Sequence, residues 1–295
     1  MTRIGPAGWA YKDWSGIVYP AARPRGFNEL AFLARYFDTL EINVSFYRPI
    51  EASTAERWLQ HVEPNPRFRF TAKLWRGFTH DRNASESDHR AVVDGLMPLW
   101  ESGRLGALLL QFPHSFRDTS ENREYLAALR GKFREFPLVL EVRHRSWSEA
   151  GVLTFLEDMA IGLCNIDQPV FKGSLKPSAV ATSLVGYVRL HGRRYDTWFT
   201  ENQYAGQRYD YKYSVEELAP WIDRIKTVEQ STADTYVVTN NHYLGKAVVN
   251  AVEIASILRA EPVPAPSTLV QHYPELAEFT RGDESSRGPE QMPLL

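Results

Sequence analysis

Eight short runs with β-strand character recur along this chain, and stretches of helical character separate most of them. The runs cover residues 3–8, 40–43, 68–73, 105–111, 139–143, 161–167, 185–191 and 236–242. Strands that alternate with helices are typical of a parallel sheet. Because 295 residues are enough for one barrel with a C-terminal extension, the pattern predicts an α/β fold of the (β/α)8 TIM type.

Helical segments are predicted between most of these runs. They cover residues 28–37, 53–61, 87–100, 121–133, 152–159, 215–228 and 244–258. Ser53 with Thr54 is typical of a helix start, and so is Ser214 with Glu217 three residues later. The caps and the periodicity together favour helices that follow most of the strands.

One connection departs from this pattern. Between the sixth and seventh strands, residues 168–182 contain Pro169, Gly173 and Pro177, which are too many helix breakers for a full helix. We therefore expect an irregular or missing barrel helix there. Residues 1–260 are predicted to form the single barrel domain.

Residues 261–295 form a predicted C-terminal extension, whose polar end after about Thr280 is expected to be disordered. No run approaches 18 apolar residues, so no membrane-spanning helix is expected. The N-terminus has no apolar signal-peptide core, so we expect no signal peptide.

Net charge and cysteine content limit the possible partners. A net charge of −2 gives no support for a general nucleic-acid or membrane-surface protein. The single cysteine, Cys164, lies in an apolar run and has no partner for an internal disulfide. A single cysteine without a disulfide partner fits a reducing compartment, and we expect a cytoplasmic protein.

Alternation within each strand predicts which side chains share a face. The faces that become polar toward the strand ends carry Glu41 and Asn43, Thr71 and Lys73, Glu141 and Arg143, Asn165 and Asp167, and Arg189 and His191. In a TIM-type barrel, all strands end at the face that carries the active site. We therefore expect one cavity there, surrounded by Glu41, Lys73, Glu141, Arg143, Asp167, Arg189 and His191.

These charged groups suggest both chemistry and anion binding. The predicted catalytic residues are Glu41, Glu141, Asp167 and His191. Paired carboxylates in different environments can divide acid and base roles. The predicted anion-binding residues are Lys73, Arg143 and Arg189, with His191 and Arg193 nearby, because arginine suits carboxylate and phosphate. Two alternatives stay open: the charges only neutralise one another, or Lys73 forms a Schiff base.

Further substrate-binding residues are predicted near the strand ends: Trp9, Tyr11, Asn43, Gln111, Asn240 and His242. Aromatic faces beside polar groups suit sugar rings or bases, although such rings also pack as a plug over a barrel. Residues 195–213 form an aromatic stretch after the seventh strand that could act as a lid or pack as a surface loop. Its rings are Tyr195, Trp198, Tyr204, Tyr209, Tyr211 and Tyr213.

Seven motifs in order resemble the YecE-like proteins, also called domain of unknown function 72. They are residues 8–20, 41–49, 70–73, 111–113, 141–147, 188–193 and 240–247. The resemblance covers about residues 3–258 and implies a TIM-type barrel. It implies no established reaction, so function has to be argued from the residues.

A metal centre is also weighed against the sequence. Glu141, Asp167 and His191 resemble the strand-end ligands of xylose-isomerase-like barrels, which usually take another Glu from strand eight. Asn240 or Asn241 stands in that region here, and arginines on the same faces compete for the carboxylates. We therefore expect no cofactor and no tightly bound metal.

The predicted function is acid–base chemistry, as hydrolysis or isomerisation, on a small polar or anionic molecule that is sugar-like or phosphorylated. The alternative is a non-catalytic module that binds a nucleotide or a nucleic-acid end, with aromatic stacking and arginine contacts to phosphate. We expect a small ligand and no membrane partner. The sequence carries no signal of oligomeric state.

Overall fold

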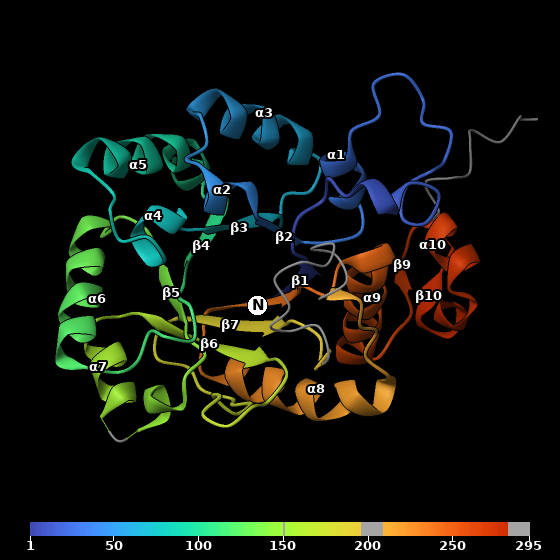
Figure 1. Ribbon diagram of the computed structural model, residues 1–295. Coiled ribbons are helices and arrows are strands. Elements are labelled where there is room, and N and C mark those ends of the chain that lie inside the picture. The colour runs from blue at the N-terminus through green and yellow to red at the C-terminus, as the bar shows by residue number, and fades with distance from the viewer. Residues whose placement is uncertain (150, 196–208, 283–295) are drawn as a thin grey trace, which may run out of the picture.

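The computed structural model describes residues 1–149, 151–195 and 209–282, and its centre is a sheet of eight parallel strands (Figure 1). The strands are β1 (Thr2–Pro6), β2 (Thr39–Ile42), β3 (Arg69–Lys73), β4 (Leu105–Gln111), β5 (Leu138–Glu141), β6 (Gly162–Asp167), β7 (Val185–Leu190) and β8 (Asp234–Thr239). Their order is β1-β8-β7-β6-β5-β4-β3-β2. The sheet curls into a nearly closed barrel, which confirms the predicted TIM-like α/β fold.

Helices surround the barrel (Figure 1). They are α1 (Glu29–Leu33), α2 (Val44–Tyr47), α3 (Ala52–Val62), α4 (Arg76–Thr79), α5 (Glu86–Glu101), α6 (Ser120–Lys132), α7 (Val152–Asp158), α8 (Val215–Gln230), α9 (Lys246–Arg259) and α10 (Ser267–His272). All seven predicted helices are present, although α1 is shorter than expected. The short helices α2, α4 and α10 were not predicted, since they span too few residues to show periodicity. Within the described residues, no helix has the length and apolar character needed to span a membrane.

The predicted helix caps have different outcomes. The prediction for Ser214 is confirmed, since its side chain accepts from the backbone N–H of Glu217 and the Glu217 side chain accepts from that of Ser214. The predicted start at Ser53 and Thr54 is wrong. Helix α3 begins at Ala52, and the residue before it, Glu51, makes no side-chain cap.

The barrel closes where β1 meets β2. An isolated parallel bridge joins Ala7 to Glu41, and the Gly8 N–H donates to the Glu41 carbonyl at 2.9 Å. Below this point the strands approach so closely that a Cβ atom at Gly5 would lie 1.8 Å from the Thr39 carbonyl oxygen. Glycine is therefore required at this seam between β1 and β2.

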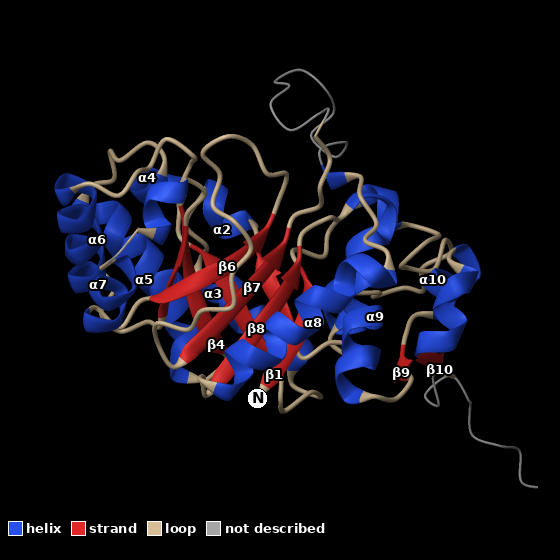
Figure 2. Cartoon of the chain, turned by 90° about the horizontal axis from the view of Figure 1, so that it is seen from below, coloured by secondary structure: helices blue, strands red, loops and turns tan. Residues whose placement is uncertain are grey.

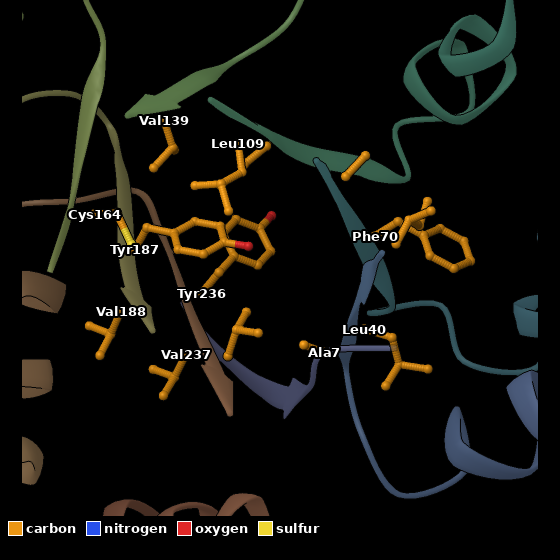
Figure 3. Packing of buried hydrophobic residues seen from close by; sticks show 14 of the residues in the cluster. Ala7, Leu40, Phe70, Leu109, Val139, Cys164, Tyr187, Val188, Tyr236 and Val237 are labelled. Atoms are coloured by element: carbon orange, nitrogen blue, oxygen red, sulfur yellow. The ribbon is translucent and has the colours of Figure 1, made fainter. Parts of the chain in front are cut away.

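Large side chains fill the lower part of the barrel. Tyr187, Tyr236 and Cys164 point into the interior, whereas Val188 and Val237 lie on the opposite face of their strands (Figure 3). Tyr236 reaches across to β4, where a Cβ at Gly106 would lie 2.0 Å from its hydroxyl oxygen. The interior is therefore packed below the C-terminal strand ends, which lie together at one end of the barrel (Figure 2).

The predicted helix gap between β6 and β7 is confirmed, since residues 168–184 contain no helix. The extended segment 174–182 covers β6 in its place. Asn165 on β6 holds this segment: its Oδ1 accepts from Ser178 Oγ at 2.7 Å and Val180 N at 2.8 Å. Its Nδ2 donates to the Val180 carbonyl at 2.9 Å.

The C-terminal extension packs onto the barrel. Tyr273 Oη donates to the Leu244 carbonyl at 2.8 Å, and Thr268 Oγ1 donates to the Val18 carbonyl at 2.9 Å. Two short strands, β9 (Val263–Pro264) and β10 (Thr280–Arg281), pair in parallel. This pairing orders Thr280 and Arg281, and the disorder expected after about Thr280 stays a prediction. Residues 283–295 lie outside the described residues.

Candidate functional site

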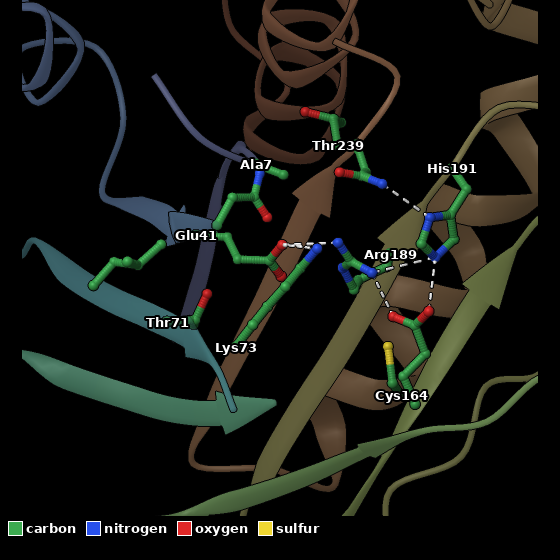
Figure 4. A network of polar contacts seen from close by, with 12 residues as sticks. Ala7, Glu41, Thr71, Lys73, Cys164, Arg189, His191 and Thr239 are labelled. Atoms are coloured by element: carbon green, nitrogen blue, oxygen red, sulfur yellow. Dashed lines mark hydrogen bonds and ion pairs between the residues drawn. The ribbon is translucent and has the colours of Figure 1, made fainter. Parts of the chain in front are cut away.

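A buried arginine lies at the centre of the polar end of the barrel (Figure 4). Arg189 on β7 has no exposed surface, and neither do Glu41 on β2 and Glu141 on β5. The Arg189 guanidinium donates through one nitrogen to Glu41 Oε1 at 2.7 Å and through the other to Glu141 Oε2 at 2.5 Å. Arg189 thus joins two carboxylates that come from different parts of the barrel wall.

Two hydroxyl groups complete the surroundings of Glu41. The Tyr187 hydroxyl donates to Glu41 Oε2 at 2.9 Å and lies 2.8 Å from Thr71 Oγ1. Burial raises the pKa of Tyr187 well above its usual value, so this hydroxyl keeps its proton. Neither Tyr187 nor Thr71 was a predicted site residue, because a tyrosine inside a strand is typical of the core. Its position two residues before Arg189, on the same face, is the signal that could have revealed it.

The second oxygen of Glu141 receives two further contacts. Arg143 donates to Glu141 Oε1 at 2.8 Å, and His191 Nε2 lies 3.2 Å from the same atom. Burial alone would raise the pKa of Glu141, but Arg189, His191 and Arg143 outweigh it and hold the pKa well below its usual range. Glu141 is therefore ionised at neutral pH.

His191 is held in one tautomer. Asn240 Nδ2 lies 3.1 Å from His191 Nδ1, so the amide donates to Nδ1 and the proton of the ring is on Nε2, facing Glu141. Burial lowers the pKa of His191 to about 3 despite the neighbouring Glu141 carboxylate. His191 is therefore a neutral imidazole that donates to Glu141.

Lys73 and Arg143 are the members of this cluster that reach solvent. Their side chains are 12% and 15% exposed, whereas those of Glu41, Glu141, Arg189 and His191 are at most 1% exposed. Lys73 Nζ lies 3.7 Å from Glu41 Oε1, which is longer than a hydrogen bond. Burial, and after it the charge of Arg189, lowers the pKa of Lys73 to about 8.

At neutral pH the cluster carries three cationic side chains, those of Lys73, Arg143 and Arg189. Two carboxylates, Glu41 and Glu141, oppose them, and His191 is neutral. Among these six side chains the cationic groups outnumber the carboxylates by one, and this net charge favours the approach of an anion. An anion entering beside Lys73 and Arg143 would balance it.

Six of the seven residues predicted to surround one cavity come together, and Asp167 does not. In the register of the sheet, Ile166 lies beside Arg189, and Cys164 lies beside Tyr187. Cys164 and Ile166 therefore face inward, and Asp167 faces outward with Asn165. Arg193 Nε donates to Asp167 Oδ2 at 2.9 Å. The prediction that Asp167 faces the cavity is wrong, because Asp167 pairs with Arg193 on the outer side of the barrel while Ile166 takes the inward position beside Arg189.

Three rim residues meet above the cluster. Tyr11 donates its hydroxyl proton to the Ala7 carbonyl at 2.7 Å and accepts from Asn43 Nδ2 at 3.2 Å. Its ring stacks on His242 with 4.2 Å between ring centroids. Burial lowers the pKa of His242 to about 4. Asn43 Oδ1 and His242 Nδ1 are buried and have no hydrogen-bond partner among the described residues.

The remaining predicted residues are more dispersed. Trp9 packs edge-on against Trp58, with 5.3 Å between ring centroids, and so faces away from the cluster. Gln111 ends β4 beside Glu141 in the sheet register. Gln168, which was not predicted, accepts from Arg143 at 2.9 Å.

The aromatic stretch after β7 is only partly described. Tyr209 lies 4.8 Å from His242 between ring centroids, and Tyr213 Oη accepts from the Gly192 N–H at 2.8 Å. Trp198 and Tyr204 lie outside the described residues, so the lid stays a prediction.

The acidic and imidazole side chains do not assemble a metal site within the described ranges, which contain no group of three or more His, Cys, Asp or Glu placed to hold an ion. Asp167 points away from Glu141 and His191, and two arginines occupy Glu141. The donor set therefore does not fit the three-ligand site that the strand ends suggested.

Two cavities lie away from the cluster. One of about 960 Å³ opens near the N-terminal strand ends, beside Asp38, Asn65 and Arg259. The other, of about 670 Å³, lies beside residues 170–180. We regard the cluster as the candidate site, because it concentrates buried charge at the C-terminal strand ends.

Comparison with known proteins finds one matching family. A model described as "Protein of unknown function DUF72" matches residues 3–272. The UPF0759 protein YunF of Bacillus subtilis (strain 168) is 28% identical over 277 residues, which are 88% of this chain and 96% of that protein.

Two solved structures agree with this match. A DUF72 family protein from Thermotoga maritima MSB8 is 30% identical with a TM-score of 0.76, covering 88% of this chain and 99% of that one. Another from Enterococcus faecalis V583 is 24% identical with a TM-score of 0.75, covering 88% and 96%, and supports the fold alone.

Proposed function

The chain belongs to the DUF72 family of proteins of unknown function, and from its own residues we propose an acid–base enzyme acting on a small anionic molecule. The substrate class is a sugar-like or phosphorylated molecule, and the reaction class is isomerisation or hydrolysis. The observation that carries this proposal is that Lys73 and Arg143, two cations of an otherwise buried charge cluster, reach solvent at the C-terminal strand ends.

Arg143 and Lys73 supply the anion contacts in this proposal. A guanidinium presents paired donors that match a carboxylate or a phosphate. Arg143 is fixed by Glu141 and by Gln168 at 2.9 Å, so it is oriented before a ligand arrives. Its partial exposure leaves room for contact from the mouth.

Lys73 is the proposed proton carrier. A group with a pKa of about 8 can give and take a proton near neutral pH, which general acid–base catalysis requires. Glu41 and Glu141, predicted as acid and base, are both held by Arg189. We therefore assign them to positioning Lys73, Arg143 and Arg189, with His191 supporting Glu141.

The rim supports a hydroxyl-bearing substrate. Asn43 Oδ1 and His242 Nδ1 are buried and have no partner, and both belong to residues that contact Tyr11. Buried polar atoms normally have a hydrogen-bond partner. A hydroxyl group of the ligand could serve each of them. The single buried cysteine, Cys164, supports placing this reaction in the reducing cytoplasm.

The rival function, binding of a nucleotide or nucleic-acid end, has weaker support. Base stacking needs a free aromatic face. The Trp9 ring packs against Trp58, and the Tyr11 ring already stacks on His242. These contacts favour the enzyme over the stacking module.

Replacing Lys73 or Arg143 with methionine tests the proposal. The ligands are inorganic phosphate and a panel of sugar phosphates, measured by calorimetry, with turnover followed by NMR. Loss of a charged hydrogen bond is worth about 1.5–3 kcal/mol, so each variant should bind at least about tenfold more weakly. Lys73→Met should also abolish turnover.

The matched control is Lys226→Met, because Lys226 is an exposed lysine on α8 that does not belong to the cluster. It should bind and react like the wild type. Unchanged binding and turnover in both Lys73→Met and Arg143→Met would sink the proposal. Salt-steep oligonucleotide binding without turnover would support the rival instead.

A further inference from the structure

The segment that replaces the missing helix forms one wall of the 670 Å³ cavity. The opposite wall comes from residues 145–148 and from Leu153 on α7. Barrel strands are normally covered by a helix on this side. Here an extended segment covers β6 and leaves a groove beside itself.

The groove is mainly apolar. Its buried floor includes Trp147, Leu163 and Leu175. Two large apolar side chains on its walls stay open to solvent, with Leu153 39% and Val170 43% exposed. Exposed apolar surface that lines a concave site is typical of a binding site.

The charges around the groove all have one sign. Arg145, Lys172 and Lys176 line it, and no acidic residue does. All three are exposed, and among the described residues no ion pair engages any of them. An apolar groove with a basic rim matches a ligand that has an apolar body and a negative end.

We propose that this groove binds a free amphipathic anion, namely a molecule with an apolar chain or ring and a carboxylate, sulfonate or phosphate group. The volume of 670 Å³ lies within the range of about 300–1,000 Å³ for small-molecule pockets. The groove is concave with a buried floor, which suits a single molecule better than the flat surface of a bilayer. The proposal does not depend on the reaction proposed for the barrel mouth.

The groove is tied to the barrel mouth through Arg143. The Leu175 N–H donates to the Arg143 carbonyl at 2.7 Å, and Gln168 accepts from the Arg143 guanidinium at 2.9 Å. The two ends of the segment 168–175 thus hold the backbone and the side chain of one cluster residue. A ligand that orders this segment would also restrict Arg143.

Calorimetry with sodium dodecanoate below its micelle concentration tests the site, with hydrogen exchange locating the bound molecule. We expect protection of residues 170–180 and at least about tenfold weaker binding by the double variant Lys172→Glu, Lys176→Glu. The matched control is Lys226→Glu, which should bind like the wild type. Dodecanol should bind more weakly than dodecanoate, because it lacks the charge.

Three results would overturn the proposal. They are equal binding by the double variant and the wild type, equal binding of dodecanol and dodecanoate, and binding only to vesicles of anionic phospholipid. Thermal melts check that the double variant is folded. If it is not, Arg145→Glu replaces it, and dodecanoate binding equal to that of the wild type would count against the site.

Discussion

At the scale of the residue, Arg189 decides how the polar end of the barrel is held together. Its guanidinium is fully buried between two fully buried carboxylates. Such a pair gains little over an apolar substitute, but breaking it leaves an unpaired buried charge. Arg189 therefore acts as a structural partner of Glu41 and Glu141, and the proposed ligand contacts fall to Lys73 and Arg143.

Replacing Arg189 with methionine should destabilise the protein by about 3–5 kcal/mol at pH 7, because it strands buried carboxylates. Chemical denaturation at pH 7 measures this loss. Adding Glu141→Gln to the variant should recover part of it, since one stranded charge is then removed. A loss below about 1 kcal/mol would show that Arg189 is not a structural partner.

The loss of stability in Arg189→Met should be smaller at pH 5 than at pH 7. In the variant, burial without Arg189 raises the pKa of a stranded carboxyl above its unfolded value of about 4.3. A carboxyl group whose pKa is higher in the folded state than in the unfolded state lowers the stability of the protein as the pH rises above the unfolded pKa. This loss of stability disappears as the pH falls back toward the unfolded pKa. In the wild type the pKa of Glu141 is held well below its usual range, so its contribution persists at pH 5. A loss that grows between pH 7 and pH 5 would contradict this account.

At the scale of the element, β6 shows what the sequence could and could not predict. Alternation predicted which residues of β6 share a face, and the structure keeps that grouping. It could not tell which face is inward, because that depends on what covers the strand outside. Asn165 turns outward to the segment 174–182 and Asp167 turns outward to Arg193, while Cys164 and Ile166 fill the interior.

The inner faces of β2, β3, β5 and β7 were predicted correctly. Glu41, Lys73, Glu141 and Arg189 lie on these faces, as the alternation indicated. The fold itself followed from the order of strands and helices. Tyr187 and Gln168 were missed because their roles depend on the partners across the barrel, which no local pattern records.

Asn165 should be the main anchor of the segment that replaces the helix. Its buried amide bonds Ser178, Val180 and Tyr187. Asn165→Leu should cost about 1–3 kcal/mol, since it leaves buried backbone groups unpaired. Hydrogen exchange should show faster exchange across residues 174–182. Ser178→Ala, which removes one of these contacts, is the control and should have a smaller effect; equal protection in Asn165→Leu would refute the assignment.

At the scale of the whole molecule, the two shortest connections in the eight-stranded barrel divide it into two sets of four strands. Strands β2 to β5 form one set, and β6, β7, β8 and β1 form the other. The sets meet through two residue pairs between β5 and β6, and through the isolated bridge between Ala7 and Glu41. Inside each set the ladders are longer, with six pairs between β7 and β8.

Native-state hydrogen exchange should therefore show that the β5–β6 contact and the contact between Ala7 and Glu41 open before either set of strands unfolds. We expect the amides of Leu140 and Gly8 to exchange by a common sub-global event. That event should become easier in Arg189→Met. If these amides exchange only by global unfolding in both proteins, the barrel is uniformly closed.

The two sets carry opposite parts of the charge cluster. Glu41 and Glu141 belong to the first set, and Arg189 belongs to the second, so both ion pairs cross between the sets. The cluster is thus a set of ion pairs that joins the two sets of strands, as well as a candidate site. An anion that draws Arg189 away from its carboxylates would weaken this connection. An anion held by Lys73 and Arg143 would leave the Arg189 ion pairs intact. The charges proposed to bind the ligand and the charges that join the two sets of strands therefore belong to one cluster.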